Sequence, residues 1–262
     1  MRLSPFAPLD ALIAPPPEPG RIAFLGRQPY AHRGLHSPSI VENSRAAFQA
    51  AIAVGHGIEL DVQSARDGEA FVFHDDTLNR LTFASGETVK TAAHTLDQTQ
   101  LRGSHETIPR LTEILAMVRG QVPLLIEIKA ADAKVGVLCL SVRRALEGYR
   151  GDVAIMSFNP KVVAWFGRRA PRVTRGLVIS DQGHAGMWQV NKRRALRRIA
   201  FWQAAPDFLA YDVRDLPSGF ASAQRKRGLP ILTWTVRTAP EERVAFGSAD
   251  EIIYEKPATV AL

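Results

Sequence analysis

Four short segments of this 262-residue chain combine imidazoles, carboxylates and basic side chains. They are His32-Arg33-Gly34, Glu59-Leu60-Asp61, His74-Asp75-Asp76 and Glu127-Ile128-Lys129. Each lies in or at the end of a strand-forming run, where unpaired buried charges would destabilise the fold. Their repetition therefore indicates one shared site. Histidines for proton transfer, carboxylates for a hard cation and basic groups for an anion are together what phosphodiester hydrolysis requires.

The carboxylates of Glu59, Asp61 and Glu127 predict a metal site made of oxygen ligands. Alternate residues of a strand point to the same face, so Glu59 shares a face with Asp61, as Glu127 does with Lys129. A single Glu-x-Asp is more often a solvated strand edge, but apolar neighbours and a second acidic strand favour a buried site here. Oxygen ligands suit Mg²⁺ or Ca²⁺, with Mn²⁺ as a third candidate, rather than zinc.

His32 and His74 form the predicted proton-transfer pair, because each directly abuts a charged residue. One imidazole would take a proton from the nucleophile and the other would protonate the leaving alkoxide, and the sequence leaves open which does which. Arg33 precedes a glycine at a strand end and is suited to bidentate phosphate recognition. Lys129 either pairs with Glu127 alone or also faces a phosphate oxygen.

Glu42 and Trp234 have two open interpretations each. Glu42 comes just before a predicted helix that Asn43 or Ser44 would cap, so it is either a charge favourable to the helix dipole or a residue that supports the site from behind. Trp234 either lines the substrate pocket or fills the barrel core. The threonines on both sides of Trp234 suit the opposite face of the strand, which favours the pocket.

Strand-like and helix-like runs alternate along the chain after residue 28. The candidate strands are 29–33, 57–63, 123–128, 153–157, 174–179, 207–211, 230–235 and 250–254. Eight strands alternating with helices predict an α/β fold of the parallel (β/α)8 or TIM barrel type, and the chain length fits such a barrel. Barrel enzymes keep their chemistry at the carboxyl ends of the strands.

Residues 70–74 predict an antiparallel hairpin rather than the third barrel strand. The preceding strand ends too few residues earlier for a crossover helix, and Asp67-Gly68 is a hairpin-turn signal. A turn there brings His74 opposite Asp61, back at the mouth of the barrel. The insertion that follows, at about 76–108, contains no convincing strand and is expected to cap the mouth.

Composition restricts the domain organisation, the charge of the substrate and the compartment, but it does not identify a function. Residues 1–27 are rich in proline and are interpreted as an extension of a catalytic domain at 28–262. The formal net charge of +7 favours an anionic substrate or surface. Cys139 is the only cysteine, which excludes an intrachain disulfide. No run approaches the roughly 20 apolar residues of a spanning helix, so we expect a cytoplasmic protein without membrane insertion.

One basic cluster has two possible meanings. It consists of Lys192, Arg193, Arg194, Arg197 and Arg198, with Trp188 and Trp202 nearby. An exposed basic helix on the outside of the barrel is the ordinary interpretation. Contact with a membrane surface or with nucleic acid is the alternative. We expect a small-molecule substrate and no nucleic-acid partner, and leave peripheral membrane contact open.

The segments together resemble the glycerophosphodiester phosphodiesterase family. The resemblance runs in family order through Ala31-His32-Arg33-Gly34, Glu42-Asn43-Ser44, Glu59-Leu60-Asp61-Val62, Asp67-Gly68, Phe73-His74-Asp75-Asp76-Thr77-Leu78, Ile108-Pro109, Ile126-Glu127-Ile128-Lys129, Ser157-Phe158 and Trp234-Thr235-Val236. It implies a phospholipase-C-like barrel that hydrolyses glycerophosphodiesters to glycerol 3-phosphate and an alcohol, within glycerol and lipid metabolism. The resemblance implies that the family's acid and base correspond to His32 and His74. It implies that the metal carboxylates correspond to Glu59, Asp61 and Glu127. The motif arginine and lysine of the family correspond to Arg33 and Lys129.

The last strand departs from the family pattern. Family members usually read Gly-Ile-Ile-Thr-Asp-x-Pro, whereas this chain reads Glu251-Ile252-Ile253-Tyr254-Glu255-Lys256-Pro257. Tyr254 is bulkier than Thr, so we expect it to narrow the pocket or alter substrate choice. The segment Leu35 to Val41 is expected to reshape the rim. Neither change is expected to touch the catalytic set.

Two other functions remain open at this level. One is a phosphodiesterase at a membrane surface, of the lysophospholipase-D-like or cyclising type. The other is a catalytically silent barrel that binds phosphodiesters. The complete set of histidines, carboxylates and lysine argues against the silent barrel.

Overall fold

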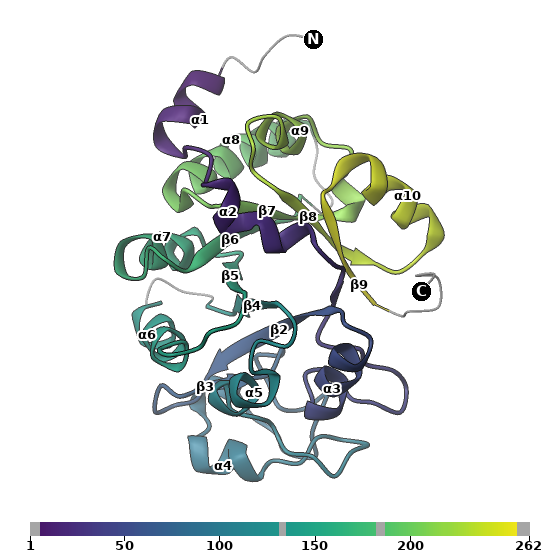
Figure 1. Ribbon diagram of the computed structural model, residues 1–262. Coiled ribbons are helices and arrows are strands. Elements are labelled where there is room, and N and C mark those ends of the chain that lie inside the picture. Colours follow the sequence, from purple (N-terminus) through teal and green to yellow (C-terminus); the bar gives the residue numbers. More distant parts are fainter. Residues whose placement is uncertain (1–5, 131–134, 182–186, 256–262) are drawn as a thin grey trace.

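Eight parallel strands close into a barrel in the computed structural model, which describes residues 6–130, 135–181 and 187–255 (Figure 1). The strands are β1 (Tyr30–Ala31), β2 (Gly57–Ser64), β4 (Leu124–Ile128), β5 (Val153–Ser157), β6 (Thr174–Ile179), β7 (Phe208–Asp212), β8 (Ile231–Val236) and β9 (Glu251–Tyr254). Strand β1 pairs with both β2 and β9, which closes the barrel. The predicted (β/α)8 barrel is confirmed, and each strand lies within two residues of its predicted bounds.

Helices cover the outside of the barrel. They are α3 (Arg45–Ala53), α5 (Leu111–Val118), α6 (Gly136–Ala145), α7 (Pro160–Arg169), α8 (Met187–Ala204), α9 (Gly219–Arg225) and α10 (Ala239–Ser248), with a short 3-10 turn, η3 (Val213–Asp215), after β7. Strand β2 shows how this arrangement places the site. Its apolar residues Ile58 and Leu60 belong to the outer core with helix residues such as Phe48. Because side chains alternate, Glu59 and Asp61 point the other way, into the barrel.

The amino-terminal end of the barrel is filled by apolar side chains. Phe24 and Leu25, in the 3-10 turn η1 (Ala23–Gly26), pack in one buried cluster with Tyr30, Leu125 and Phe208. A parallel barrel filled at this end keeps its polar groups at the carboxyl end, where loops can reach them.

The predicted hairpin is present, and its register differs by one residue from the prediction. Strand β3 (Ala70–Val72) runs antiparallel to β2 and pairs Val62 with Val72. The Phe73 amide donates to the Asp61 carbonyl at 3.0 Å, so Phe73 rather than His74 lies opposite Asp61. The chain leaves the sheet at this point, and His74 still returns to the mouth of the barrel.

The insertion at 76–108 has a small core of its own. It contains η2 (Thr88–Lys90) and α4 (Ala93–Gln98). Leu78, Leu96, Leu101 and Ile108 pack around hairpin residues such as Phe73. The insertion is therefore anchored to the hairpin that carries His74.

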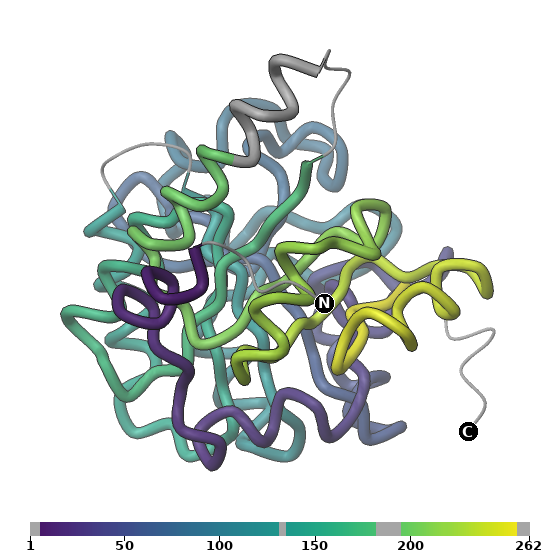
Figure 2. Tube along the Cα trace, turned by 90° about the horizontal axis from the view of Figure 1, so that it is seen from above, coloured from purple at the N-terminus to yellow at the C-terminus, as the bar shows by residue number. Residues whose placement is uncertain are grey.

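The N-terminal segment packs on the barrel through a buried carboxylate. Helices α1 (Ala7–Ile13) and α2 (Pro19–Ile22) precede the barrel, and α1 lies beside α8 in both views (Figures 1 and 2). The buried carboxylate of Asp10 accepts hydrogen bonds from Arg198 at 2.7 Å, Trp202 at 2.8 Å and Gln224 at 2.9 Å. A buried charge with three donors is well compensated, so this contact fixes α1 against α8 and α9.

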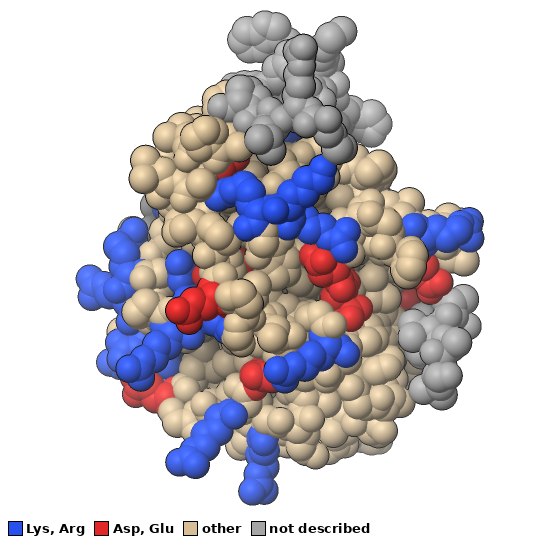
Figure 3. All heavy atoms as spheres, turned by 45° about the horizontal axis from the view of Figure 1, so that its top comes forward, with Lys and Arg blue, Asp and Glu red and all other residues tan. Residues whose placement is uncertain are grey.

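The two members of the basic cluster whose side chains are described turn inward. Arg198 binds Asp10, and Arg197 binds Asp181 and the Tyr211 hydroxyl. The side chains of Trp188 and of residues 192–194 lie outside the described part of the chain. On the face shown in Figure 3, basic side chains form separate groups with acidic ones beside them. Within the described ranges, no helix is long and apolar enough to cross a membrane.

Candidate active site

A tight turn after β1 brings Arg33 to the carboxyl end of the barrel. Arg33 has a φ of 56° and Gly34 a φ of 78°, both in the left-handed region. A Cβ on Gly34 would lie 2.8 Å from atoms of Ala47 and Phe48, so only glycine fits there. The Arg33 amide donates to Glu59 Oε2 at 3.0 Å, which holds an uncommon backbone conformation in place.

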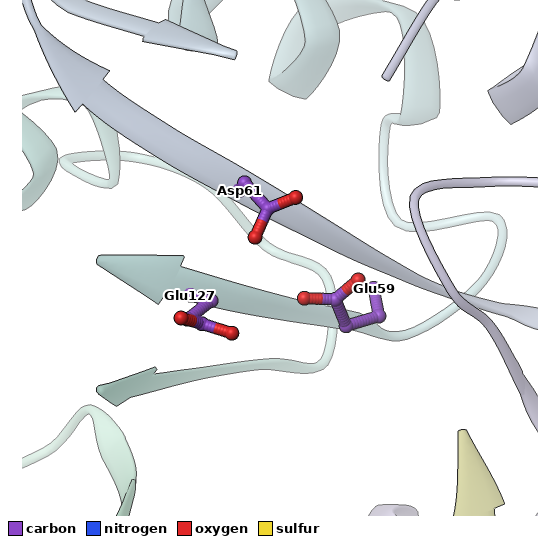
Figure 4. A group of neighbouring side chains, drawn as sticks. All are labelled: Glu59, Asp61 and Glu127. Atoms are coloured by element: carbon purple, nitrogen blue, oxygen red, sulfur yellow. The ribbon is translucent and has the colours of Figure 1, made fainter. Parts of the chain in front are cut away.

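Three buried carboxylates meet over strands β2 and β4. Glu59 and Asp61 come from β2 and Glu127 from β4, directly beside Asp61 in the sheet register (Figure 4). One oxygen from each lies within 4.8 Å of the others. Glu59 Oε1 is buried and accepts no hydrogen bond from any described residue. An unpartnered buried carboxylate oxygen in an oxygen-only cluster fits a site for a hard divalent cation.

Two basic side chains partly neutralise the acidic cluster. Lys129 Nζ lies 2.5 Å from Glu127 Oε1 and 3.0 Å from Asp61 Oδ1. Arg33 Nε lies 3.2 Å from Asp61 Oδ2, and the Arg33 guanidinium also donates to Glu42 at 2.7 Å. The cluster therefore holds three carboxylates against two cations within ion-pair distance, which leaves room for more positive charge.

Burial and charge push the three carboxyl pKa values apart. Burial raises the pKa of Glu59 well above its usual range, and the charges of Asp61 and Glu127 add to this. Burial raises the pKa of Glu127 to about 7, although Lys129 opposes it. Burial acts in the same direction on Asp61, but Lys129 and Arg33 outweigh it and hold the Asp61 pKa below its usual range. A bound cation would take the place of protons that the cluster otherwise keeps.

His32 is buried in the site and contacts Glu255, the residue that follows β9 (Glu251–Tyr254). Its Nδ1 is 2.7 Å from Glu255 Oε1, and its Nε2 is 3.9 Å from Glu59 Oε2. Burial lowers the pKa of His32, although the hydrogen bond to Glu255 opposes this. The expectation that the altered last strand leaves the catalytic set untouched is therefore wrong: Glu255 binds one of the two predicted histidines.

His74 lies nearer the rim, with 31 % of its side chain exposed. Its Nδ1 is 2.7 Å from Asp75 Oδ1. Arg80, from the insertion, donates to Asp75 at 2.6 Å and 2.8 Å and to Glu42 at 2.7 Å and 3.0 Å. Glu42 thus lies between Arg33 and Arg80, and burial, which alone would raise its pKa, is outweighed by these two cations.

Six of the nine predicted site residues line a cavity of about 380 Å³. It is lined by His32, Arg33, His74, Glu127, Lys129, Phe158, Asp212, Arg214, Trp234, Thr235, Arg237 and Glu241. Trp234 forms one wall, with its ring edge-on to Phe158 at 5.5 Å. Glu42, Glu59 and Asp61 do not line the cavity themselves.

Tyr254 does not line this cavity, contrary to expectation. Its side chain is buried in the core outside the barrel, and its hydroxyl lies 2.7 Å from His56 Nδ1. Neighbouring strand residues point to opposite faces, so Tyr254 turns outward while Glu255 reaches the site.

Three supporting residues were missed or misread in the sequence. The sequence offered Asn43 or Ser44 as a helix cap; Ser44 is the cap, while Asn43 Nδ2 donates to Asp61 Oδ2 at 2.9 Å. Glu255 was noticed only as a departure from the family pattern. Arg80 lies six residues after His74, and nothing in the local sequence indicated a role for it. Its partners are Asp75, close in sequence, and Glu42, 38 residues away.

A parallel barrel that gathers carboxylates, imidazoles and cations at one end defines a barrel enzyme for an anionic substrate. The model of the glycerophosphoryl diester phosphodiesterase family matches residues 32–258, and the chain belongs to this family. It is thus a phosphoric diester hydrolase.

Individual relatives agree with this membership. The chain is 31 % identical over 243 residues to a glycerophosphodiester phosphodiesterase of Caldanaerobacter subterraneus, covering 88 % of this chain and 94 % of the relative. A glycerophosphodiester phosphodiesterase structure from Agrobacterium tumefaciens has a TM-score of 0.64 at 26 % identity, over 88 % and 95 % of the two chains. A phosphodiesterase structure from Oleispira antarctica, solved with its product sn-glycerol-3-phosphate, has the same fold, with a TM-score of 0.74 at 23 % identity over 88 % and 93 %.

Proposed function

We propose that the protein hydrolyses glycerophosphodiesters to glycerol 3-phosphate and an alcohol in a metal-dependent reaction. Family membership and the product bound to the Oleispira antarctica protein support this substrate class. The observation that carries the proposal is the acidic cluster, which adjoins a cavity with two imidazoles and four basic side chains on its walls. Residues 28–262 would form the catalytic domain.

Glu59, Asp61 and Glu127 would hold one divalent cation, Mg²⁺ or Ca²⁺, with Mn²⁺ as a third candidate. The oxygen-only donors and the unpartnered Glu59 Oε1 support this assignment. When bound, the cation would neutralise phosphate charge that builds up during hydrolysis. Glu42 would keep Arg33 in place from behind, through the 2.7 Å ion pair between them.

Arg33 and Lys129 would bind the phosphate oxygens. Both side chains line the cavity and carry their charge beside carboxylates. Positioned cations at a phosphoryl group stabilise the transition state more than the ground state, because negative charge on the oxygens rises during the reaction. Trp234 would pack against the organic part of the substrate.

His32 and His74 would transfer the protons. Both imidazoles line the same cavity, and each has its Nδ1 occupied by a carboxylate. One would accept a proton from the nucleophile while the other gives a proton to the leaving alkoxide. Turnover by this route requires both rings to present Nε2 to the substrate.

Release of glycerol 3-phosphate from glycerophosphocholine and glycerophosphoethanolamine tests this proposal. We expect release that EDTA abolishes and that Mg²⁺, Ca²⁺ or Mn²⁺ restores. His74→Ala should lower kcat by about 100-fold or more, whereas His94→Ala, at an exposed position of α4, should leave it unchanged. Absence of release from both substrates with every metal would contradict the proposal, and lysophospholipids would then be assayed.

A further inference from the structure

The two histidines have matching contacts at Nδ1. His32 Nδ1 lies 2.7 Å from Glu255 Oε1, and His74 Nδ1 lies 2.7 Å from Asp75 Oδ1. An ionised carboxylate can only accept, so Nδ1 of each ring must carry a proton and donate it. Nε2 of each ring is then the free nitrogen.

Each carboxylate is in turn held by an arginine. Arg237 Nε donates to Glu255 Oε2 at 2.5 Å, and Arg80 Nε donates to Asp75 Oδ2 at 2.6 Å. The same chain of arginine, carboxylate and imidazole therefore occurs twice, built from different segments. Repetition at the two rings that line one cavity indicates a shared requirement of the chemistry rather than a chance surface pair.

The side-chain hydrogen bond of His32 is to Glu255. The His32 side chain is 10 % exposed and that of Glu255 16 %, so little water is available to replace the bond. Two other carboxylates act on the ring without a hydrogen bond: Glu59, at 3.9 Å from Nε2, and Asp61, through its charge. His36 is the remaining titratable neighbour of Glu255, at 4.0 Å.

We propose that Glu255 is a positioning residue for His32: its carboxylate, held by Arg237, fixes the Nδ1–H tautomer and turns Nε2 toward the cavity. The proton on Nδ1 stays there, and Glu255 exchanges none. This role rests on the proposed function only in so far as His32 transfers a proton during turnover. Outer partners of this kind orient a histidine and set which nitrogen is available.

Glu255→Gln gives a sharp test, because Arg237 can only donate. The glutamine oxygen must face Arg237, so its NH₂ group faces His32 Nδ1 and favours the opposite tautomer, with the proton on Nε2. We expect kcat to fall by about 100-fold with KM and metal dependence within about twofold. Glu255→Asp should keep more than a tenth of the kcat. Tyr254→Phe, the adjacent residue outside the cavity, is the control and should match the wild type.

The tautomer itself can be measured without turnover. In protein labelled with ¹⁵N-histidine at pH 8, the His32 signals are assigned as those lost in His32→Gln. We expect Nδ1–H in the wild type and Nε2–H in Glu255→Gln. This pair of spectra would support the positioning role even if the wild type released no glycerol 3-phosphate, which would contradict only the proposed function. An unchanged tautomer, an unchanged kcat in an active enzyme, or a loss confined to KM would overturn the role of Glu255.

Discussion

Asn43 and Asp61 form two hydrogen bonds with each other. Asn43 Nδ2 donates to Asp61 Oδ2 at 2.9 Å, and the Asp61 amide donates to Asn43 Oδ1 at 3.3 Å. The Asn43 amide also donates to the Arg33 carbonyl at 2.9 Å. Asn43 thus joins the turn after β1 to the acidic cluster on β2, so it orients a predicted metal ligand from behind.

Asn43→Gly should weaken metal binding without distorting the chain. Asn43 has a φ of 54°, which glycine adopts without strain, so the substitution removes only the side-chain contacts. We expect metal affinity to fall by about 10-fold to 100-fold, as for other outer partners of metal ligands. Calorimetric titration with Mg²⁺ or Ca²⁺ measures this change.

The control for Asn43→Gly is Arg119→Gly. Arg119 has a φ of 50° at the exposed carboxyl end of α5, far from the acidic cluster in the fold. Arg119→Gly also places a glycine at a left-handed backbone position, and it should leave metal affinity unchanged. Equal affinity in the wild type and in Asn43→Gly would remove Asn43 from the metal site.

The strands, the hairpin and the grouping of the acidic residues could all be predicted from the sequence. Alternating apolar residues set the strand faces, so the separation of Leu60 from Glu59 and Asp61 follows from local pattern alone. The hydrogen-bond partners of the site residues could not be predicted in this way. Glu255 lies 223 positions from His32, and only closure of the barrel by β9 brings them together. Local pattern offered Asn43 and Ser44 as alternative helix caps and did not indicate the contact of Asn43 with Asp61.

The stability of the metal-free protein should fall as pH rises through the range set by Glu127. The Glu127 pKa is about 7 in the folded protein and 4.5 ordinarily, so between these values the folded state keeps a proton that the unfolded chain has lost. This contribution is full below pH 4.5 and disappears as pH rises past about 7. It amounts to about 3 kcal/mol of unfolding free energy.

Urea unfolding in EDTA at a series of pH values, compared with Glu127→Gln, isolates this contribution. The wild type should lose more stability than the variant between pH 4.5 and 7. Mg²⁺ at about 100 times its Kd should restore about 2.7 kcal/mol to the wild type at pH 8, because a cation requires the deprotonated carboxylates. Parallel curves for the two proteins would show that Glu127 titrates normally.

Arg80→Gln should lower activity more than stability. Arg80 joins Glu42, which holds Arg33, to Asp75, which holds His74. Its side chain is 48 % exposed, so we expect less than about 1 kcal/mol loss of unfolding free energy. Looser placement of the two groups should lower kcat/KM by about 10-fold.

Lys90→Gln is the matched control for Arg80→Gln. Lys90 lies in the same insertion and forms an exposed pair with Glu87. Its replacement should leave kcat/KM unchanged. If Arg80→Gln behaved like this control, the bridge between Glu42 and Asp75 would have no part in turnover.

Tyr254→Thr, which restores the residue usual in the family, should change stability and leave substrate choice alone. The Tyr254 ring is 2 % exposed in the outer core and its hydroxyl contacts His56, so removal should cost about 2–4 kcal/mol of unfolding free energy.

Phe158→Ala should have the opposite effect, because Phe158 lines the cavity and is 48 % exposed. It should shift the KM ratio for glycerophosphocholine and glycerophosphoethanolamine with little loss of stability. A changed ratio in Tyr254→Thr and an unchanged one in Phe158→Ala would show that Tyr254, despite its outward packing, governs the substrate.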